Sequence, residues 1–260
     1  MKAQDPNSLL TDHLRALHLP SIREGFEESA RKAEQESLSY ERYLLDLVEA
    51  EVEMRRNNRV RRFLKESKLP LEKNLGTFEL DRLPRKAKQQ IKTLMEGCFL
   101  DRCENVLAFG NPGSGKTHLL CALAHELIHQ GRRVLMTPCN LLVQQLLIAK
   151  RDLKLARLLK RLGKFDAVLI DDIGYVQQSR EEMEVLFTLL ADRYERGSVM
   201  ISSNLPFSKW EAIFKDAMTT AAAIDRLVHH SVILELNIPS YRVDKAKQRK
   251  KGEVSQKETA

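Results

Sequence analysis

The residues from Gly110 to Thr117 match a phosphate-binding pattern at every fixed position. In order they are Gly110, Asn111, Pro112, Gly113, Ser114, Gly115, Lys116 and Thr117, which fit G-x-x-x-x-G-K-[ST]. The glycines let backbone N–H groups close around phosphate oxygens, and the ammonium of Lys116 is expected to neutralise the terminal phosphates. Thr117 is the expected Mg²⁺ ligand. The loop therefore predicts a site for a nucleoside triphosphate.

The sequence on both sides of this loop supplies the context that the pattern requires. Apolar residues 106–109 predict a buried strand, and residues 118–130 predict a helix that ends at Gly131. The N-terminus of that helix would add its partial positive charge at the phosphates. The predicted strand, loop and helix together favour a phosphate-binding loop over a glycine turn that matches the pattern by chance.

Two aspartates and an asparagine follow later predicted strands. Asp171 and Asp172 come directly after the apolar run 167–170, which is typical of a parallel strand buried on both faces. Ligands of open α/β sheets bind at such strand ends. We assign Asp171 to the Mg²⁺ shell and Asp172 to orienting the attacking water. Asn204 follows the run 199–201, and its amide is a candidate to sense the γ-phosphate or to position the water.

The order of predicted elements specifies the fold class. From residue 85 onward helices alternate with short apolar strands, which predicts an α/β domain with a doubly wound parallel sheet. The first seventy residues show helical periodicity alone. The chain is therefore predicted to have a helical DNA-binding domain at 1–70, a linker at 71–84, a nucleotide-binding domain at 85–241 and a basic, disordered tail at 242–260. Phe78, in the linker, is equally a candidate to pack on the base and a candidate core residue.

Basic residues are in excess and are clustered. Lys and Arg number 43 against 36 Asp and Glu, and the net charge of +7 favours a polyanionic partner. The first cluster comprises Arg55, Arg56, Arg59, Arg61 and Arg62. The second comprises Lys150, Lys154, Arg157 and Arg161, which share one face if residues 141–162 form a single helix. We expect both clusters to follow the phosphates of double-stranded DNA, although a solvated face would explain the first cluster taken alone.

Cysteine usage and hydropathy bound the compartment. Cys98, Cys103, Cys121 and Cys139 are spaced too widely for a paired metal site, so we expect reduced thiols. No apolar run approaches the length of a membrane span, and no signal-peptide pattern is found. These observations predict a cytoplasmic protein with no membrane partner.

One further pattern is rejected. Residues 125–129 read His-Glu-Leu-Ile-His, which matches the HExxH signature of zinc proteases. The helix that carries them begins at the phosphate loop and is expected to pack on the sheet, and no third ligand follows at a familiar spacing. The phosphate loop with its matched Asp171 and Asp172 is the more specific pattern, so we do not expect a zinc site.

With these residues in view, the chain resembles the IstB-type ATPases that are encoded beside the transposase in bacterial insertion sequences. The resemblance is nearly full length. The strings that carry it lie at 110–117, 170–175, 193–197, 203–207, 225–227, 229–231 and 240–242. The phosphate loop is generic, whereas the later strings are specific in combination.

The IstB-type proteins are similar to helicase-loader and replication-initiator ATPases of the AAA+ class. The resemblance implies that Asn204 is the sensor 1 residue and that Arg226 is an arginine finger for a neighbouring subunit. It further implies a transposition helper in DNA recombination: an ATPase that uses ATP and Mg²⁺, assembles as a homo-oligomer on target DNA, deforms it and recruits the transposase of the same element. Two features depart from the AAA+ pattern. Asp172 stands where Glu is usual, and the sequence after the last strand has too few patterned residues for a helical lid.

Three other functions remain open at this level. A replicative-helicase loader would share the catalytic residues and the basic clusters, and only its partner would differ. A small-molecule kinase would need an acceptor pocket and an activity indifferent to DNA, which the basic clusters argue against. A DNA-binding scaffold without hydrolysis would need neither Asp171 nor Arg226.

Overall fold

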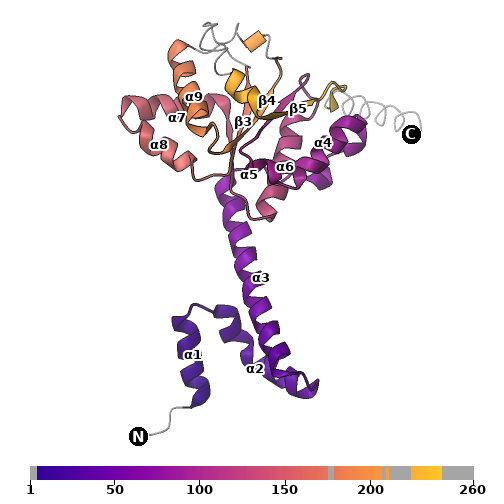
Figure 1. The fold of residues 1–260 in the computed structure, drawn as a ribbon, viewed down its shortest axis with the longest axis vertical. Helices are drawn as coiled ribbons and strands as arrows, with labels where there is room; N and C mark the ends of the chain where they lie inside the picture. The colour runs from indigo at the N-terminus through magenta and orange to yellow at the C-terminus, as the bar shows by residue number, and fades with distance from the viewer. Residues whose placement is uncertain (1–4, 175–178, 207–208, 211–223, 242–260) are drawn as a thin grey trace, which may run out of the picture. The chain divides into compact units, whose positions relative to one another are not determined.

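The computed structural model describes residues 5–174, 179–206, 209–210 and 224–241 (Figure 1). The chain divides into two compact units, Met1–Arg62 and Phe63–Ala260. Among the described residues no helix is both long and apolar enough to cross a bilayer.

The first unit is helical. It contains α1 (Pro6–Ala16), α2 (Pro20–Gln35) and most of α3 (Tyr40–Ser67). A proline at the first position starts both α1 and α2, where its missing N–H costs no hydrogen bond. A small apolar cluster holds the unit together and consists of Leu14, Phe26 and Leu47, with Leu19, Ile22 and Tyr43 packed around them.

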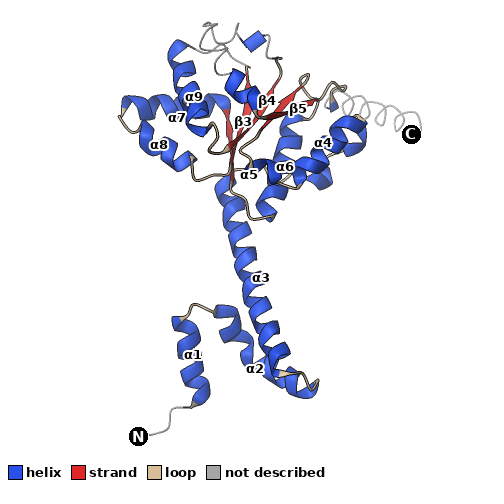
Figure 2. Cartoon of the chain, in the orientation of Figure 1, coloured by secondary structure: helices blue, strands red, loops and turns tan. Residues whose placement is uncertain are grey.

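The second unit is built on a five-stranded parallel sheet (Figure 2). Its strands are β1 (Asn105–Phe109), β2 (Val134–Pro138), β3 (Ala167–Ile173), β4 (Ser198–Ser203) and β5 (Ser231–Glu235). They lie in the order β2-β3-β4-β1-β5. The predicted doubly wound parallel sheet is therefore confirmed. Because β4 lies between β1 and β3, the residues after these three strands meet at one edge of the sheet.

Helices flank this sheet. They are α4 (Arg85–Met95), α5 (Cys98–Asp101), α6 (Lys116–His129), α7 (Cys139–Arg151), α8 (Leu155–Leu162) and α9 (Arg180–Arg193). Two short 3-10 turns, η1 (Leu75–Thr77) and η2 (Leu80–Arg82), precede α4. A capping box in which Ser179 and Glu182 bond each other's backbone N–H starts α9.

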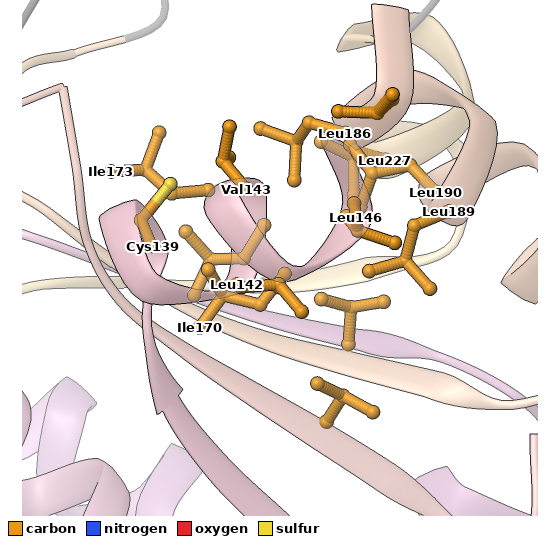
Figure 3. Close-up of a cluster of buried hydrophobic side chains, with 14 of the residues drawn as sticks. Cys139, Leu142, Val143, Leu146, Ile170, Ile173, Leu186, Leu189, Leu190 and Leu227 are labelled. Carbon is orange, nitrogen blue, oxygen red and sulfur yellow. The ribbon is translucent and has the colours of Figure 1, made fainter. Parts of the chain in front are cut away.

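An apolar stripe on α7 forms the centre of one side of the core (Figure 3). Its residues, Cys139, Leu142, Val143 and Leu146, recur at steps of three, one and three, so they face the same way along the helix. They pack with Ile170 and Ile173 of β3 and with Leu186, Leu189 and Leu190 of α9. This close-packed apolar layer thus holds the carboxyl end of β3 in place.

Residues 141–162 do not form a single helix, so the condition under which the four basic residues would share one face is not met. Helix α7 ends at Arg151, and Leu153 adopts a left-handed conformation with φ of 57° before α8 begins. The break reorients α8 so that its leucines pack against the core. Lys150 therefore does not continue a stripe with Lys154. Its ammonium instead lies 3.0 Å from a carboxylate oxygen of Glu184 on α9.

The boundary between the units lies at Arg62/Phe63, before the predicted position at residue 70. The last turns of α3 belong to the second unit, where the Arg133 guanidinium lies 5.5 Å from the centre of the Phe63 ring and donates to Glu66 at 2.8 Å. The remaining predicted boundaries stay predictions. The tail at 242–260, and with it the question of a lid, lies outside the described residues.

Arg193 ties three segments of the second unit together from inside. Its side chain is buried, and its guanidinium donates to the carbonyls of Leu162, Phe165, Asp166 and Ser198 at 2.9–3.2 Å. Burial lowers the pKa of Arg193 to about 10, which leaves the group charged at neutral pH.

Replacing Arg193 with Leu should destabilise the protein by about 3 kcal/mol or more, because buried carbonyls are left without donors. The free energy of unfolding in urea measures this effect. Arg196→Leu is the control, since Arg196 is exposed and lies 3.8 Å from Asp192 in a surface ion pair that contributes little. Equal stability of the two variants would contradict the interpretation.

Candidate functional site

The phosphate loop connects the end of β1 to the start of α6. Gly110 has a φ of 155°, and a Cβ at that position would collide with the backbone carbonyl of Leu236. Gly115 has a φ of 91° and caps α6 in a left-handed conformation that favours glycine. The backbone conformation of the loop therefore requires glycine at these two positions. The N-terminus of α6 points into the space that the loop encloses.

Lys116 brings two strand ends together. Its side chain is 4% exposed, and its ammonium donates to the carbonyls of Gly110 and Asn111 at 2.8 and 3.0 Å. It also donates to the amide oxygen of Asn204 at 2.5 Å. The structure thus unites two residues that the sequence assigned separately to phosphate binding and to phosphate sensing.

The candidate metal ligands also meet. The hydroxyl of Thr117 donates to Asp171 at 2.7 Å, and the hydroxyl of Ser202 donates to the same carboxylate oxygen at 2.5 Å. The Ser202 hydroxyl in turn accepts from the backbone N–H of Asp172 at 2.9 Å. A hydroxyl and a carboxylate oxygen are ligands that suit Mg²⁺. Ser202 was not assigned from the sequence, because its role depends on the pairing of β4 with β3.

Asp172 faces the cavity rather than the core. It is exposed, has a φ of 58°, and belongs to the lining of the cavity beside the loop. Asp171, the residue before it, is 9% exposed. The two neighbouring carboxylates therefore have different surroundings, as their separate assignments to metal and to water require.

A cavity of about 320 Å³ lies along the loop. Its lining comprises residues 112–118 with Lys73, Thr77, Phe78, Glu79, Arg82, Asp172, Asn204, Ile238 and Tyr241. The hydroxyl of Ser114, in the loop, is buried and has no hydrogen-bond partner among the described residues. A cavity of this size, with the Ser114 hydroxyl available in its loop as a hydrogen-bond donor, fits a nucleotide phosphate.

The segment before α4 closes one side of this cavity. Nε2 of His118 lies 3.0 Å from the Thr77 hydroxyl and 3.2 Å from the Asn74 carbonyl. Burial lowers the pKa of the His118 imidazole. Phe78 contacts the His118 ring edge-on, with 5.2 Å between the ring centres, and lies against Gly115. Phe78 is thus at the cavity wall, where its two predicted roles, against a base and in packing, are both open.

The residues after β5 close another side. The backbone N–H of Tyr241 donates to the carbonyl of Gly113 at 3.0 Å. Arg82 donates to the Pro239 carbonyl at 3.2 Å, and its guanidinium lies 5.2 Å from the centre of the Tyr241 ring. Sequence reasoning did not assign Arg82 or Tyr241 to the cavity, although Tyr241 lies in one of the strings that carry the family resemblance.

Arg226 lies elsewhere. It is exposed and lines a small surface recess together with Asn105, Arg193 and Tyr194. Asn105 is the first residue of β1, whereas the phosphate loop follows the last, so the two sites lie at opposite edges of the sheet, roughly 16 Å apart at 3.3 Å per residue. The buried side chain of Asn105 donates to the Leu227 carbonyl at 3.2 Å. Arg226 is thus anchored far from its own chain's cavity.

The two predicted DNA-binding clusters have different surroundings. In the first unit Arg55 is engaged internally, with Glu51 at 2.7 Å and the His18 carbonyl at 2.5 Å, while Arg56, Arg59 and Arg61 are exposed. Burial raises the pKa of the Glu51 carboxyl, but hydrogen bonds from Arg55 and the backbone outweigh it and lower the pKa overall.

In the second unit a groove of about 900 Å³ follows α7 and α8. We call it the basic groove, after the cations that line it: Lys68, Lys154, Arg157, Lys160, Arg161 and Lys164. Asp152 is the acidic residue in the lining. The sequence assigned Lys154, Arg157 and Arg161 to one cluster, and all three line this groove. Lys150, assigned to the same cluster, is not in the lining. Lys68, Lys160 and Lys164 were not assigned, since the fold around the α7–α8 break brings them in.

The two histidines of the HExxH string have different surroundings. His125 is buried, and its Nε2 lies 3.1 Å from the Pro70 carbonyl, while His129 is exposed at the end of α6. Within the part of the chain that the structure describes, no three His, Cys, Asp or Glu residues form a group able to hold a metal ion. Burial of Cys121 raises the pKa of its thiol to about 12, so it is unreactive.

Known proteins with similar sequences share one family description. The model of the IstB-like ATP-binding proteins matches residues 12–250. An insertion sequence ATP-binding protein of Sinorhizobium fredii is 41% identical over 230 residues, covering 88% of this chain and 77% of the relative. The insertion sequence IS21 ATP-binding protein of Pseudomonas aeruginosa is 35% identical over 251 residues, covering 96% and 92%.

Solved structures with a similar fold are ATPases of DNA replication. The DnaC helicase loader aligns with a TM-score of 0.55 and 19% identity, covering 65% of this chain and 98% of the loader. DnaA from Aquifex aeolicus, bound to AMPPCP, aligns with a TM-score of 0.55 and 18% identity, covering 72% and 57%. At these identities the likeness concerns the fold, which is of the AAA+ phosphate-loop type.

Replacing Ser202 with Ala should raise the Mg²⁺ concentration needed for half-maximal ATP hydrolysis by about 10-fold or more, because the carboxylate of Asp171 loses the hydroxyl that orients it. A titration of hydrolysis against Mg²⁺ at saturating ATP measures this shift. Ser203→Ala is the matched control, since among the described residues that hydroxyl bonds the backbone of Ile173 and Leu205. If both variants kept the original Mg²⁺ dependence, Ser202 would have no part in the metal site.

Proposed function

Since the chain belongs to the family of IstB-like ATP-binding proteins and is an ATPase of the AAA+ class, we propose that it works as a transposition helper. In this proposal ATP-bound subunits assemble on double-stranded target DNA, deform it and recruit the transposase of the same element. The observation that carries the proposal is the arrangement around Lys116. A phosphate-binding ammonium, a sensing amide and a Thr–Asp pair meet at the ends of three adjacent strands.

The residues of this arrangement divide the work of hydrolysis. Backbone N–H groups of the loop and the Lys116 ammonium would bind the phosphates, and Lys116 would exchange its bonds to loop carbonyls for phosphate oxygens. Thr117 and Asp171 would hold Mg²⁺, which supplies charge neutralisation at the phosphates. Asp172, exposed to the cavity, would accept a proton from the attacking water, and Asn204 would fix the position of that water.

A second subunit is required to complete this site. Arg226 is anchored at the opposite edge of the sheet from its own cavity, so its guanidinium would act on the γ-phosphate of a neighbour. Head-to-tail contact of this kind produces a homo-oligomer. The cavity's own walls, formed by Phe78 and Tyr241, contribute aromatic surface on which a base can pack.

DNA is the proposed partner of the basic residues. The basic groove concentrates six cations against Asp152 and is open to solvent, as a phosphate-tracking surface has to be. The exposed Arg56, Arg59 and Arg61 of the first unit, with Arg55 and Arg62 beside them, offer a second such surface. The IS21 and Sinorhizobium relatives, named as insertion sequence proteins, support transposition as the setting.

A helicase loader is the second candidate, since the fold aligns with 98% of the DnaC loader. The two functions differ in the partner that the DNA-bound oligomer recruits. The sequence relatives at 35% and 41% identity favour the transposition helper. Capture of a transposase encoded next to this chain, tested against capture of a hexameric helicase, separates the two.

The proposed role of Arg226 as an arginine finger can be tested by mixing two variants. Arg226→Ala should bind ATP normally yet hydrolyse it about 10³-fold more slowly or worse, because the charge is missing where the transition state forms. Asp172→Asn should bind ATP and assemble, hydrolyse ATP slowly because the carboxylate beside the water is lost, and keep an intact finger. Mixing the two variants on DNA should restore part of the steady-state ATPase rate, and sedimentation confirms that they co-assemble. Co-assembled mixtures that stay inactive would refute the shared site.

The proposed binding of DNA to the basic groove can be tested through the salt dependence of the affinity. Replacing Lys154, Arg157 and Arg161 with Gln should weaken DNA binding equally for all sequences and reduce the salt slope of log K by roughly 0.9 for each phosphate that is no longer neutralised. Fluorescence anisotropy at several salt concentrations measures both effects. Lys150→Gln is the matched control, because Lys150 pairs with Glu184 outside the groove. An unchanged slope in the triple variant would assign the groove to another partner.

A further inference from the structure

Leu153 stands out among the apolar residues of the second unit. Its side chain is 94% exposed, more than any other large hydrophobic side chain in the described part of the chain. The leucines that follow it, Leu155, Leu158 and Leu159, pack against the core. A single exposed leucine is unremarkable by itself. Here the exposure is combined with an unusual backbone.

The backbone of Leu153 occupies a conformation that leucine disfavours. Its φ is 57°, at the position just beyond a helix where glycine or asparagine usually stands. Two backbone bonds hold the turn: the N–H of Leu153 donates to Lys150 at 3.1 Å, and that of Lys154 donates to Ala149 at 2.7 Å. The turn thus presents the leucine outward in one fixed orientation. A large apolar group that is both strained and exposed suggests a function rather than a packing need.

The surroundings of Leu153 are cationic. Arg151 and Lys154 flank it, and their side chains are 78% and 67% exposed. Asp152 lies 3.6 Å from Arg151 and 3.7 Å from Lys154, as an exposed ion pair that is easily exchanged for phosphate. Lys154, the N-cap residue of α8, also lines the basic groove, so a cation of the groove directly follows Leu153 in the chain.

We propose that Leu153 is an apolar wedge that inserts between neighbouring base pairs of duplex DNA held by the basic groove. The cations would grip the phosphates on both sides of one step, and the leucine would partly unstack that step and kink the duplex. Apolar side chains flanked by basic residues bend DNA in this way. The inference rests on the proposed DNA binding and adds to it the residue that deforms the DNA.

The charges favour DNA over protein as the occupant. The centres of protein interfaces are depleted of lysine and combine several apolar side chains, whereas Leu153 has a basic residue close to it on either side in the chain, Arg151 and Lys154. A wedge needs only one apolar side chain, because the stacked bases on either side surround it. The rigid turn also suits a wedge, since a mobile side chain would fold back on its own surface.

Leu153→Gly tests the wedge. The change removes the side chain and relieves the left-handed strain, so the variant should be at least as stable to heat as the original protein. Its affinity for an intact duplex should fall about 10-fold, as expected when one apolar side chain is no longer buried between bases. Its salt slope should be unchanged, because every cation that pairs with a phosphate is still present. Leu153→Met, which keeps an apolar reach, should retain most of the affinity.

The decisive readouts report on the DNA. A duplex with 2-aminopurine at successive steps should brighten on binding the original protein and Leu153→Met, and its labelled ends should approach each other. Both signals should disappear with Leu153→Gly at saturating protein. Leu71→Gly, at another exposed leucine of the second unit, is the matched control and should keep both.

Each other outcome overturns the proposal. If Leu153→Gly binds, bends and unstacks DNA as the original protein does, the wedge is wrong while DNA binding stands. If the original protein binds no duplex, the proposed DNA partner fails and the wedge fails with it. If Leu153→Gly instead fails to self-assemble in the absence of DNA, as seen by sedimentation, Leu153 contacts a neighbouring subunit.

Discussion

The hydrogen bond between Lys116 and Asn204 is the interaction on which the rest of the site depends. It joins the loop after β1 to the end of β4, and it forms only because β4 lies next to β1 in the sheet. On the other side of β4, Ser202 reaches the carboxylate of Asp171 at the end of β3. The strand order β3-β4-β1 therefore places cation, amide and carboxylate side by side. The dry core beneath α7 and α9 keeps these strand ends in register.

Much of this arrangement could be predicted from the sequence, because its signals are local. A phosphate loop between an apolar run and a helix, and Asp171 after a second apolar run, are read within a few residues. Parallel strands then put their ends at one edge without further information. The fold class follows from the same alternation, and the comparisons agree with it.

Other residues could not be found in this way, since their roles depend on neighbours distant in sequence. Ser202 and Asn105 look like ordinary strand residues until the pairing of β4 with both β3 and β1 is known. The helical break at Leu153 was missed because periodicity continues across it, and leucine gives no sign of a left-handed turn. The same break separates Lys150 from Lys154 and brings Lys68, Lys160 and Lys164 into the basic groove, which no helical projection of residues 141–162 reveals.

Strand β1 carries the phosphate loop at one end and, through Asn105, anchors the segment of Arg226 at the other. Each subunit in a head-to-tail assembly therefore has a donor end and an acceptor end. In an open assembly of any length, one terminal subunit has a nucleotide site that no neighbour completes. That subunit would keep its ATP longest, so the two ends of the assembly are chemically distinct. Growth and loss of subunits would then have a direction, and a partner could recognise one end alone.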